Sequence, residues 1–584
     1  MAKRTNLLSL LLFILILTAI CYSAGISGNF NLDDGANIRL NSALHIHSLT
    51  PQTLWQAATS SSAGPLGRPI STLTFALNYY FSGLDATYYK ITNLGIHLAN
   101  GVVIFLLSRL LLGLHLRLRN KEDLQKASLF GLATASLWLL HPFNLTSVIY
   151  VVQRMTSLSA FFVLCALSAY VYGRQKLVDG NKYALFWISV AFFLFTPIAM
   201  LCKETGALTP LFIFITETTL LRWTTPRKEW SHWLIIFVGL AAAAPIIFGT
   251  LYLLKHFEIL MGGYVWRDFT LIERLMTEAR ALWFYIHMTL VPALSEMGLH
   301  HDDFLISRGL LLPWTTLPAA SGILALVSAA FLLRNKHPLI TFGIYFFLIG
   351  HALEGTIIPL EIVFEHRNYL PMIGILLPLS YYALNAEFHF SSIRLRRPAF
   401  ILMIALFASL TTVRAHQWGN TLAMRTLEVE HHQGSVRAHI DLAILYDYLP
   451  PTSQKDAIDL YQKARLHYQQ AADIGTSSIS GLIGILAMNT RRGIPIEESL
   501  LASLEQRLST VPFGPPNMNT LIGLARDIAK GNIVIKQDII DRLFRSAISN
   551  PRLTIADRNQ IILEFGRLPP EIRPKLGNQG SPLY

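Results

Sequence analysis

The stretch WLIIFVGLAAAAPIIFGTLYLL, which is Trp233–Leu254, carries no charged side chain. It is long enough for a helix that crosses the hydrocarbon core of a bilayer, which takes about 20 apolar residues. Similar runs recur on both sides of it, and the shorter ones need their flanks to reach that length. The clearest are Leu7–Ile26, Ile91–Leu114, Phe161–Tyr172, Ala184–Leu201, Leu208–Leu221, Leu317–Leu333, Leu339–Ile358, Ile373–Leu384 and Ala399–Val413, and the weaker ones are Leu129–Leu140 and Met276–Pro292. These runs predict an all-α, polytopic membrane helix bundle.

The composition of the whole chain agrees with this prediction. Of its 584 residues, 52% are hydrophobic and only 14% are charged, whereas a soluble protein has about 25% charged residues. The net charge is +12, which in a soluble protein would suggest a nucleic-acid partner. The sequence contains no nucleic-acid-binding motif, so we expect membrane lipids and no nucleic acid among its partners.

The Lys and Arg residues lie mostly in short loops between the apolar runs, which is the pattern typical of cytoplasmic loops. The N-terminus is therefore predicted to be cytoplasmic. The last basic loop is predicted to be cytoplasmic too, so everything after Ala399–Val413 should lie outside. The basic loops are Lys3–Arg4, His115–Lys126, Arg174–Lys182, Arg222–Lys228, Arg334–Lys336 and Arg394–Arg397.

This arrangement requires an odd number of crossings, but the sequence offers twelve candidates. The basic loops confine the surplus candidate to the region between residues 233 and 333. Met276–Pro292 is the best choice, because Glu278, Arg280 and His287 interrupt it. We therefore expect about eleven crossings, with Met276–Pro292 lying along the membrane interface as an amphipathic helix.

The first apolar run has a second interpretation. It begins after basic residues and ends near the small residues Ser23–Gly25, as a cleaved signal peptide does. Because the run is long enough to span the membrane, we favour its retention. The chain has only three cysteines, Cys21, Cys165 and Cys202, which provide neither a disulfide framework nor a cysteine metal site.

The composition changes near Trp418, after which no long apolar run remains. This change predicts a transmembrane domain at 1–417 and a soluble, extracytoplasmic helical domain at 418–584. Leu442-Ala443 with Tyr446, followed by Ala457, Tyr461 and Ala464, has tetratricopeptide-repeat (TPR) spacing with about two extra residues. Further helices are expected near Leu482–Asn489, Ile496–Leu508, Met518–Ala529, Lys536–Ile548 and Ile555–Phe565. The alternatives are a TPR-like domain that binds a protein on its concave face and a generic helical domain.

Polar residues gather in the loops that are predicted to lie outside, where buried charges often mark function. The clusters are Asn31–Gly35 with Gly67–Pro69, His141–Thr146 with Gln153-Arg154, Cys202–Thr205, and Glu365–Tyr369. His300–Asp303 joins them if Met276–Pro292 does not cross. Each cluster has a plainer interpretation, such as a solvated turn, an ion pair at a helix end or a helix stop, but all of them converge on one face.

The residue types in these clusters suit transfer from a lipid phosphate. Asp33 and Asp34 can provide a general base or hold a divalent cation such as Mg²⁺ or Mn²⁺. Of the two we favour Asp34 as the base, because it lies farther from the helix end and Gly35 follows it. Cationic side chains can neutralise a phosphate leaving group. The candidate phosphate ligands are Arg68, Arg154, Lys203 and Arg367, and the candidate supporting residues are His141, Glu204, Glu365 and His366.

Several stretches before residue 415 also match a known pattern. They are Phe30–Asp34, Gly67–Tyr79, Lys90–Asn100, His141-Pro142 with Thr146, Gln153-Arg154, Lys203-Glu204 and Glu365–Pro371. In these stretches the sequence resembles the transmembrane and tetratricopeptide-repeat glycosyltransferases of the glycosyltransferase-C superfamily, and the last stretch resembles bacterial members in particular. The resemblance implies a polyprenyl- or dolichyl-phosphate sugar donor and a catalytic acid in the first extracytoplasmic loop, at Asp33 or Asp34.

The predicted function is therefore a membrane glycosyltransferase of the bacterial inner membrane. It is expected to move a sugar from a polyprenyl-phosphate donor to a Ser or Thr hydroxyl of an exported protein at the extracytoplasmic face. One alternative is transfer to a lipid or cell-surface glycan. The other is a non-catalytic membrane scaffold whose helical domain binds proteins, which would need no cations opposite a carboxylate pair.

Overall fold

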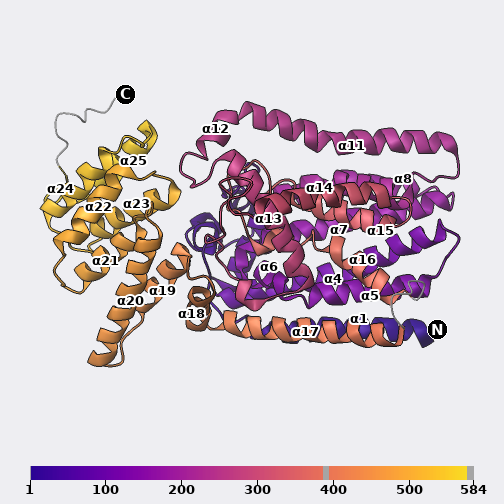
Figure 1. Ribbon diagram of the computed structural model, residues 1–584, viewed down its shortest axis with the longest axis horizontal. Helices are drawn as coiled ribbons and strands as arrows, with labels where there is room; N and C mark the ends of the chain where they lie inside the picture. Colours follow the sequence, from indigo (N-terminus) through magenta and orange to yellow (C-terminus); the bar gives the residue numbers. More distant parts are fainter. Residues whose placement is uncertain (1, 386–392, 575–584) are drawn as a thin grey trace. The chain divides into compact units, whose positions relative to one another are not determined.

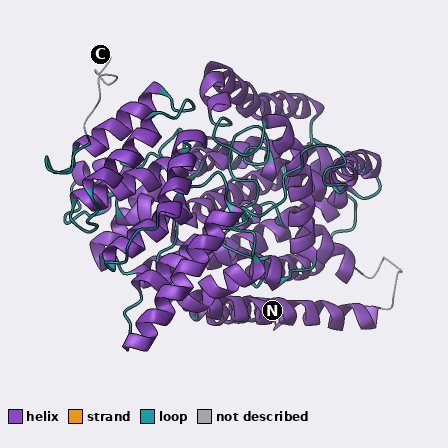
Figure 2. Ribbon diagram, turned by 60° about the vertical axis from the view of Figure 1, so that its left-hand side comes forward, coloured by secondary structure: helices purple, strands orange, loops and turns teal. Residues whose placement is uncertain are grey.

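The computed structural model describes residues 2–385 and 393–574. These residues fold into helices joined by loops, with an isolated bridge between Gly309 and Leu312 and no β-strand (Figures 1 and 2). The all-α prediction is therefore confirmed. The chain forms two compact units. The first unit is Met1–Phe257, Ile272–Met297 and Leu305–Met424, and the second unit is Glu258–Leu271, Gly298–Phe304 and Arg425–Tyr584.

The apolar runs of the first unit lie mostly in helices or in consecutive helical segments, but Leu339–Ile358 is helical only to His351 and continues as turns. Asp85 and Asp123 begin two of these helices, each accepting a backbone N–H in the first turn. The helices are α1 (Ala2–Ser23), α2 (Pro51–Ala58), α3 (Pro69–Ser82), α4 (Ala86–Arg117), α5 (Leu124–Leu139), α6 (Leu145–Ile149), α7 (Arg154–Val178), α8 (Ala184–Val190), α9 (Thr196–Cys202), α10 (Thr209–Thr216), α11 (Lys228–Lys255), α13 (Leu271–Leu290), α14 (Thr316–Leu333), α15 (Pro338–His351), α16 (Ile373–Leu384) and α17 (Ile393–Gly419).

Six of the described helical segments are long and apolar enough to cross a membrane, and α5 with the bent segment Pro142–Ile149 makes a seventh if the pair is one span. α15, α16 and the segment Leu7–Ser23 are shorter apolar helices. The chain is therefore a multi-pass membrane protein, as predicted. The number of eleven crossings stays a prediction.

The loops predicted to be cytoplasmic come together at one end of the first unit. Arg117 forms an ion pair with Asp179 at 2.7 Å, and the Arg222 guanidinium donates to the Arg334 carbonyl at 3.0 Å. α1 and α17 pack side by side and both begin at this end (Figure 1). α17 begins at Ile393, so Arg396 and Arg397 lie in its first two turns and not in the loop before it, because the helix continues beyond its apolar part.

α13, which contains Met276–Pro292, is not among the helices apolar enough to span. Arg274 near its start donates to the carbonyls of Glu354, Thr356 and Leu360. Thr289 near its end accepts from the Asn368 amide at 2.8 Å. Both ends of α13 therefore contact the region that follows α15, and the location of α13 along the membrane interface stays a prediction.

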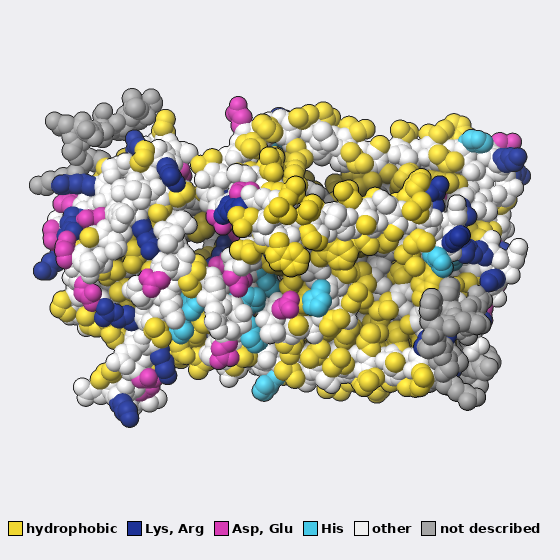
Figure 3. All heavy atoms as spheres, in the orientation of Figure 1, with side chains coloured by type: hydrophobic (Ala, Val, Ile, Leu, Met, Phe, Trp, Pro, Cys, Tyr) yellow, Lys and Arg dark blue, Asp and Glu magenta, His cyan; other side chains and the backbone are white. Residues whose placement is uncertain are grey.

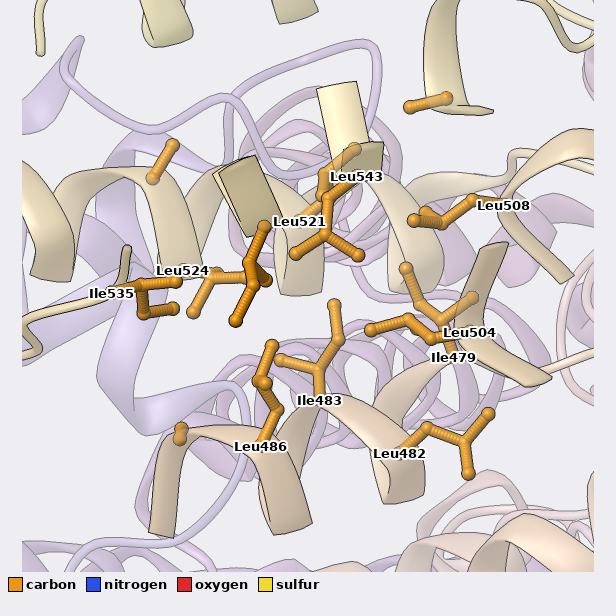
Figure 4. Packing of buried hydrophobic residues seen from close by; sticks show 14 of the residues in the cluster. Ile479, Leu482, Ile483, Leu486, Leu504, Leu508, Leu521, Leu524, Ile535 and Leu543 are labelled. Atoms are coloured by element: carbon orange, nitrogen blue, oxygen red, sulfur yellow. The ribbon is translucent and has the colours of Figure 1, made fainter. Parts of the chain in front are cut away.

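The second unit is built from helices that alternate with short loops around a shared apolar core. Leu482, Ile483 and Leu486 of one helix face Leu504 and residues of later helices in this core (Figure 4). Each later helix that the sequence predicts is present. The helices are α12 (Phe257–Gly262), α18 (Thr421–His431), α19 (Val436–Tyr448), α20 (Gln454–Ile474), α21 (Ser480–Arg491), α22 (Glu498–Thr510), α23 (Pro515–Ala529), α24 (Gln537–Ile548) and α25 (Ile555–Gly566).

The second unit also holds the acidic and histidine-rich segment His300–Asp303. His300 contacts Asp441 at 2.9 Å, and Asp303 contacts His432 at 3.0 Å. Ser435 donates to Asp302 at 2.5 Å. These contacts explain the segment by packing within the second unit, because each of its charged groups has a partner there.

The predicted orientation can be tested with reporters on the full chain. A reporter fused after Tyr584 should be active only outside the cytoplasm, and one inserted at Asn181 should be active only inside it. The reason is that basic loops stay on the cytoplasmic side of the membrane, and Asn181 lies at the end of the bundle where these loops gather. Activity of both reporters in the same compartment would contradict the odd number of crossings.

Candidate functional site

The acidic loop after α1 is held in place by two other parts of the first unit. The buried ammonium of Lys90 in α4 donates to the carbonyls of Gly25 and Gly28, at 3.3 and 2.5 Å. The Tyr150 hydroxyl accepts the backbone N–H of Asp33 at 3.0 Å. The loop is therefore ordered by contacts with α4 and with the segment before α7.

The two neighbouring carboxylates of this loop have different environments. Asp34 is fully buried, and its two oxygens accept the backbone N–H groups of Asn31 at 2.8 Å and Val152 at 2.7 Å. Burial raises the pKa of Asp34 to about 7, although these hydrogen bonds and Lys90 oppose the shift. The side chain of Asp33 is exposed. Asp34 is thus placed to anchor the loop, whereas Asp33 is open to solvent.

A group of cations lies at the same end of the bundle. The Arg68 guanidinium pairs with Glu204 at 2.9 Å, and the Lys203 ammonium pairs with Glu354 at 2.8 Å. Arg367 lies 3.9 Å from the other oxygen of Glu354. We call these five residues the cationic cluster. It brings together three of the four predicted phosphate ligands and carries one net positive charge.

Arg68 of the cationic cluster is positioned by a tight turn before α3. Gly64 has φ +68°, and a Cβ on it would lie 2.1 Å from Glu204 Oε1. Arg68 has φ +49°, in the left-handed region that a non-glycine residue adopts only when its surroundings hold it there. The ion pair with Glu204 provides such a restraint. The loop from Gly64 to Arg68 is therefore fitted closely onto Glu204.

The segment from Tyr150 to Thr156 connects the acidic loop to the cationic cluster. Its first part holds the acidic loop through Tyr150 and Val152. Further along, Arg68 contacts the Met155 sulfur at 3.4 Å, and Lys203 donates to the Thr156 hydroxyl at 3.0 Å. The segment Tyr150–Thr156 therefore contacts both the loop that carries Asp33 and two of the cations, Arg68 and Lys203.

Arg154 lies inside this segment but points away from the cationic cluster. Its Nε donates to Asn93 at 2.7 Å, and its terminal nitrogens donate to the carbonyls of Thr74 and Tyr89, each at 3.0 Å. The guanidinium is fully buried and lies 4.7 Å from the centre of the Phe75 ring. These contacts show Arg154 fastening the segment to α3 and α4.

The cationic cluster encloses little free space. A cavity of about 30 Å³ is lined by Lys203, Glu354 and Arg367 among others, which is room for about one water molecule. Lys203 and Arg367 are nearly buried, whereas the side chain of Arg68 is 21% exposed. An anion would therefore meet the cluster at Arg68.

The other predicted supporting residues separate into two groups. His366 is buried beside the cationic cluster. Burial is the main reason that the pKa of His366 lies well below its ordinary value, and the positive charge of Lys203 lowers this pKa further. His141 and Glu365 make contacts elsewhere. The Nε2 of His141 contacts the Thr289 carbonyl at 3.0 Å, and Glu365 forms a buried ion pair with Arg414 at 2.7 Å.

Asp33 and Asp34 are also the predicted ligands of a divalent cation. Among residues 2–385 and 393–574, no group of three or more His, Cys, Asp or Glu side chains has metal-binding geometry. Both oxygens of Asp34 already accept backbone N–H groups. Of the two carboxylates, only that of Asp33 is exposed.

Sequence reasoning missed the three residues that organise this site, which are Lys90, Tyr150 and Glu354. A signal was present for two of them. Glu354 is the acidic residue within the apolar run Leu339–Ile358, and Lys90 is the charge just before Ile91–Leu114. A charge within or beside an apolar run is costly unless it is paired, so each of these residues called for a partner.

Comparison with known proteins finds relatives that match part of the chain. It is 30% identical to the protein O-mannosyl-transferase TMTC4 of Homo sapiens over 194 residues, which are 32% of this chain and 26% of that protein. It is also 30% identical to the human protein O-mannosyl-transferase TMTC3 over 207 residues, which are 34% of this chain and 20% of that protein. Identity to the protein O-mannosyl-transferase tmtc2 of Xenopus laevis is 28% over 198 residues, 32% of this chain and 21% of that protein.

These matches span about a quarter or less of the length of the relatives. No family model matches the chain, and no solved structure matches it. The resemblance carried by the motifs agrees with the comparisons, because the relatives are proteins of the TMTC type. Over about a third of its length, this multi-pass membrane protein is similar to protein O-mannosyl-transferases of animals.

Proposed function

We propose that this chain is a glycosyltransferase of the bacterial inner membrane that uses a polyprenyl-phosphate sugar. Its acceptor is a Ser or Thr hydroxyl of an exported protein at the extracytoplasmic face. The observation that carries the proposal is that the segment Tyr150–Thr156 contacts both the backbone of the exposed Asp33 and two cations, Arg68 and Lys203. Transfer from a phosphate leaving group needs a base that takes the proton of the acceptor and cations that stabilise the departing phosphate.

In the proposed reaction the donor enters sideways from the membrane and its phosphate meets Arg68. Lys203 and Arg367 add positive potential from beneath, because they are nearly buried and paired with a single carboxylate. Asp33 takes the proton of the acceptor hydroxyl. The hydroxyl oxygen forms a bond to the anomeric carbon while the bond from that carbon to the phosphate oxygen breaks. Polyprenyl phosphate leaves, and a single displacement inverts the anomeric configuration.

The assignment of Asp33 in place of Asp34 as the base follows from exposure. A base must come within hydrogen-bond reach of the proton that it takes. Asp34 is enclosed by the N–H groups of Asn31 and Val152, so its part in the proposal is to position Asp33. Arg154 is likewise a positioning residue here, since all three of its nitrogens donate to protein oxygens.

The second unit is proposed to receive the acceptor protein. A polar hollow of about 160 Å³ between α20, α21 and α22 is lined by Arg465, Asn489 and Glu497 among others. This hollow can take polar groups of an extended peptide. The names of the relatives make mannose the first sugar to test.

The phosphate site is tested by comparing Arg68→Ala with Lys126→Ala, a variant at a lysine of a basic loop whose side chain is 58% exposed. Loss of a charge-assisted phosphate contact costs about 2–3 kcal/mol, so sugar transfer by Arg68→Ala should fall about thirty- to more than a hundredfold. The measurement is transfer from a polyprenyl-phosphate mannose to envelope protein, read by intact mass. Equal turnover in Arg68→Ala and wild type would show that the donor phosphate does not bind this cluster.

A further inference from the structure

The first unit has a large hollow between α11 and the pair α7 and α8, at the end opposite the cationic cluster. Its volume is about 600 Å³, within the range of about 300–1,000 Å³ that ligand pockets occupy. Apolar side chains dominate the lining, among them Leu185, Phe193, Trp233 and Phe237. The hollow has the size and the chemistry of a site for an acyl chain.

α11 leaves this hollow open because it packs loosely. Only 17% of its most apolar window is buried, compared with 72% for the helix Val151–Val178 that includes α7. Figure 3 shows apolar side chains covering α11 and a recess beneath it. A helix whose apolar face is not covered by protein is covered by lipid in the membrane, and here the lipid has a defined hollow to enter.

A second hollow of about 280 Å³ continues from the first, because Leu177, Leu185 and Trp230 line both. Lys182 and Arg227 line the second hollow. We call the two hollows together the α8–α11 groove. One half of the groove is therefore apolar, and the other half is a polar mouth with two cations.

The position of the mouth matches the level of lipid headgroups. Trp230 lies where the two hollows meet, and Trp233 lines the apolar half. Tryptophan is enriched at the interface between headgroups and acyl chains. The mouth lies in the loops that join α7 to α8 and precede α11, which are two of the basic loops in the sequence.

Charge selects the kind of lipid. Lys182 and Arg227 line the mouth, and Lys182 also lies 5.2 Å from the centre of the Tyr183 ring. Glu229 lines the apolar half and is the single acid among the lining residues. The groove thus has one net positive charge, which matches one phosphodiester without a compensating ammonium group.

We propose that the α8–α11 groove binds one anionic glycerophospholipid. One acyl chain lies between α8 and α11, and the phosphodiester lies between Lys182 and Arg227. The sugar donor is also a lipid phosphate, but its reacting phosphate must meet the cations at the other end of α9, beyond Cys202. A bilayer lipid is therefore the occupant that the position favours.

Native mass spectrometry of the full chain in detergent tests this proposal. After delipidation, the chain is titrated separately with phosphatidylglycerol, phosphatidylcholine and polyprenyl phosphate. Wild type should retain one phosphatidylglycerol at least tenfold more tightly than phosphatidylcholine. Each Lys or Arg near an anionic lipid contributes about fivefold, so Lys182→Ala/Arg227→Ala should weaken phosphatidylglycerol binding by about twenty- to thirtyfold.

Matched variants separate a specific groove from general surface charge. Arg119→Ala/Lys126→Ala removes two cations from a neighbouring basic loop outside the groove and should leave phosphatidylglycerol binding unchanged. Ser189→Trp fills the apolar half, where Ser189 is part of the lining, and should abolish retention of the lipid. Equal retention of the two phospholipids, equal losses in the two double variants, or retention of polyprenyl phosphate alone would each overturn the proposal.

Discussion

Asp33→Asn is expected to lower sugar transfer by about 10²–10⁴-fold, which is the contribution that a positioned general base typically makes. Asn has the shape of Asp but cannot take the proton of the acceptor hydroxyl. The side chain of Asp33 is exposed, and its backbone N–H donates to Tyr150, so the substitution leaves the anchoring of the loop intact. The measurement is transfer to an envelope-protein acceptor at matched expression.

Asp34→Asn is the matched control for this prediction. Its amide oxygen can accept only one of the two N–H groups that Asn31 and Val152 direct at the carboxylate, and its NH₂ group meets the other. We expect a looser acidic loop and a smaller loss of activity than in Asp33→Asn. Excess Mg²⁺ or Mn²⁺ should rescue neither variant if Asp33 is a base.

Three results would contradict the assignment of Asp33. Full activity in the Asp33→Asn/Asp34→Asn double variant would remove the catalytic role of both and favour a membrane scaffold. Rescue of either single variant by a divalent cation would place a metal at these residues. If activity requires Asp34 but not Asp33, the base is Asp34, which is the residue that its position in the sequence favours.

Glu365→Gln is expected to destabilise the first unit by about 3–5 kcal/mol, the usual cost of removing one partner of a buried ion pair. The side chains of Glu365 and Arg414 are 1% and 2% exposed, and both carboxylate oxygens accept from one Arg414 nitrogen, at 2.8 and 2.7 Å. Without Glu365 the guanidinium charge stays buried with the Pro142 carbonyl as its partner at 2.8 Å. Thermal unfolding in detergent, followed by tryptophan fluorescence, measures the effect.

Two further variants identify the cause of this loss. Glu365→Gln/Arg414→Met removes both charges and should recover much of the stability, because an apolar pair of similar volume avoids the buried charge. Asp179→Asn breaks the ion pair with Arg117, whose side chains are 36% and 34% exposed, and should cost only about 0–1 kcal/mol. A loss in Glu365→Gln no larger than that in Asp179→Asn would show that the buried pair does not stabilise the fold.

The helices were predictable because the property that decides them is local. A run such as Trp233–Leu254 must be a helix in a bilayer, since only a helix satisfies its own backbone groups there. The later helices of the second unit, such as α21 and α23, follow in the same way from apolar residues at helical spacing. The amphipathic character of α13 was also readable, from the charges that interrupt its apolar residues.

The sequence by itself thus determined the all-helical, multi-pass architecture and the group of polar loops from which the site is built. Only the tertiary structure decided the roles inside that group. Asp33 and Asp34 are neighbours in the chain, yet Asp34 is buried and accepts the N–H of Val152, more than a hundred residues away, whereas Asp33 is exposed. Arg154 and Arg367 look equivalent as cations, but the first is enclosed by α3 and α4, and the second lies beside Glu354. The physical reason is that the cost of burying a charge depends on its partner, and the partner is set by the packing of helices that are distant in sequence.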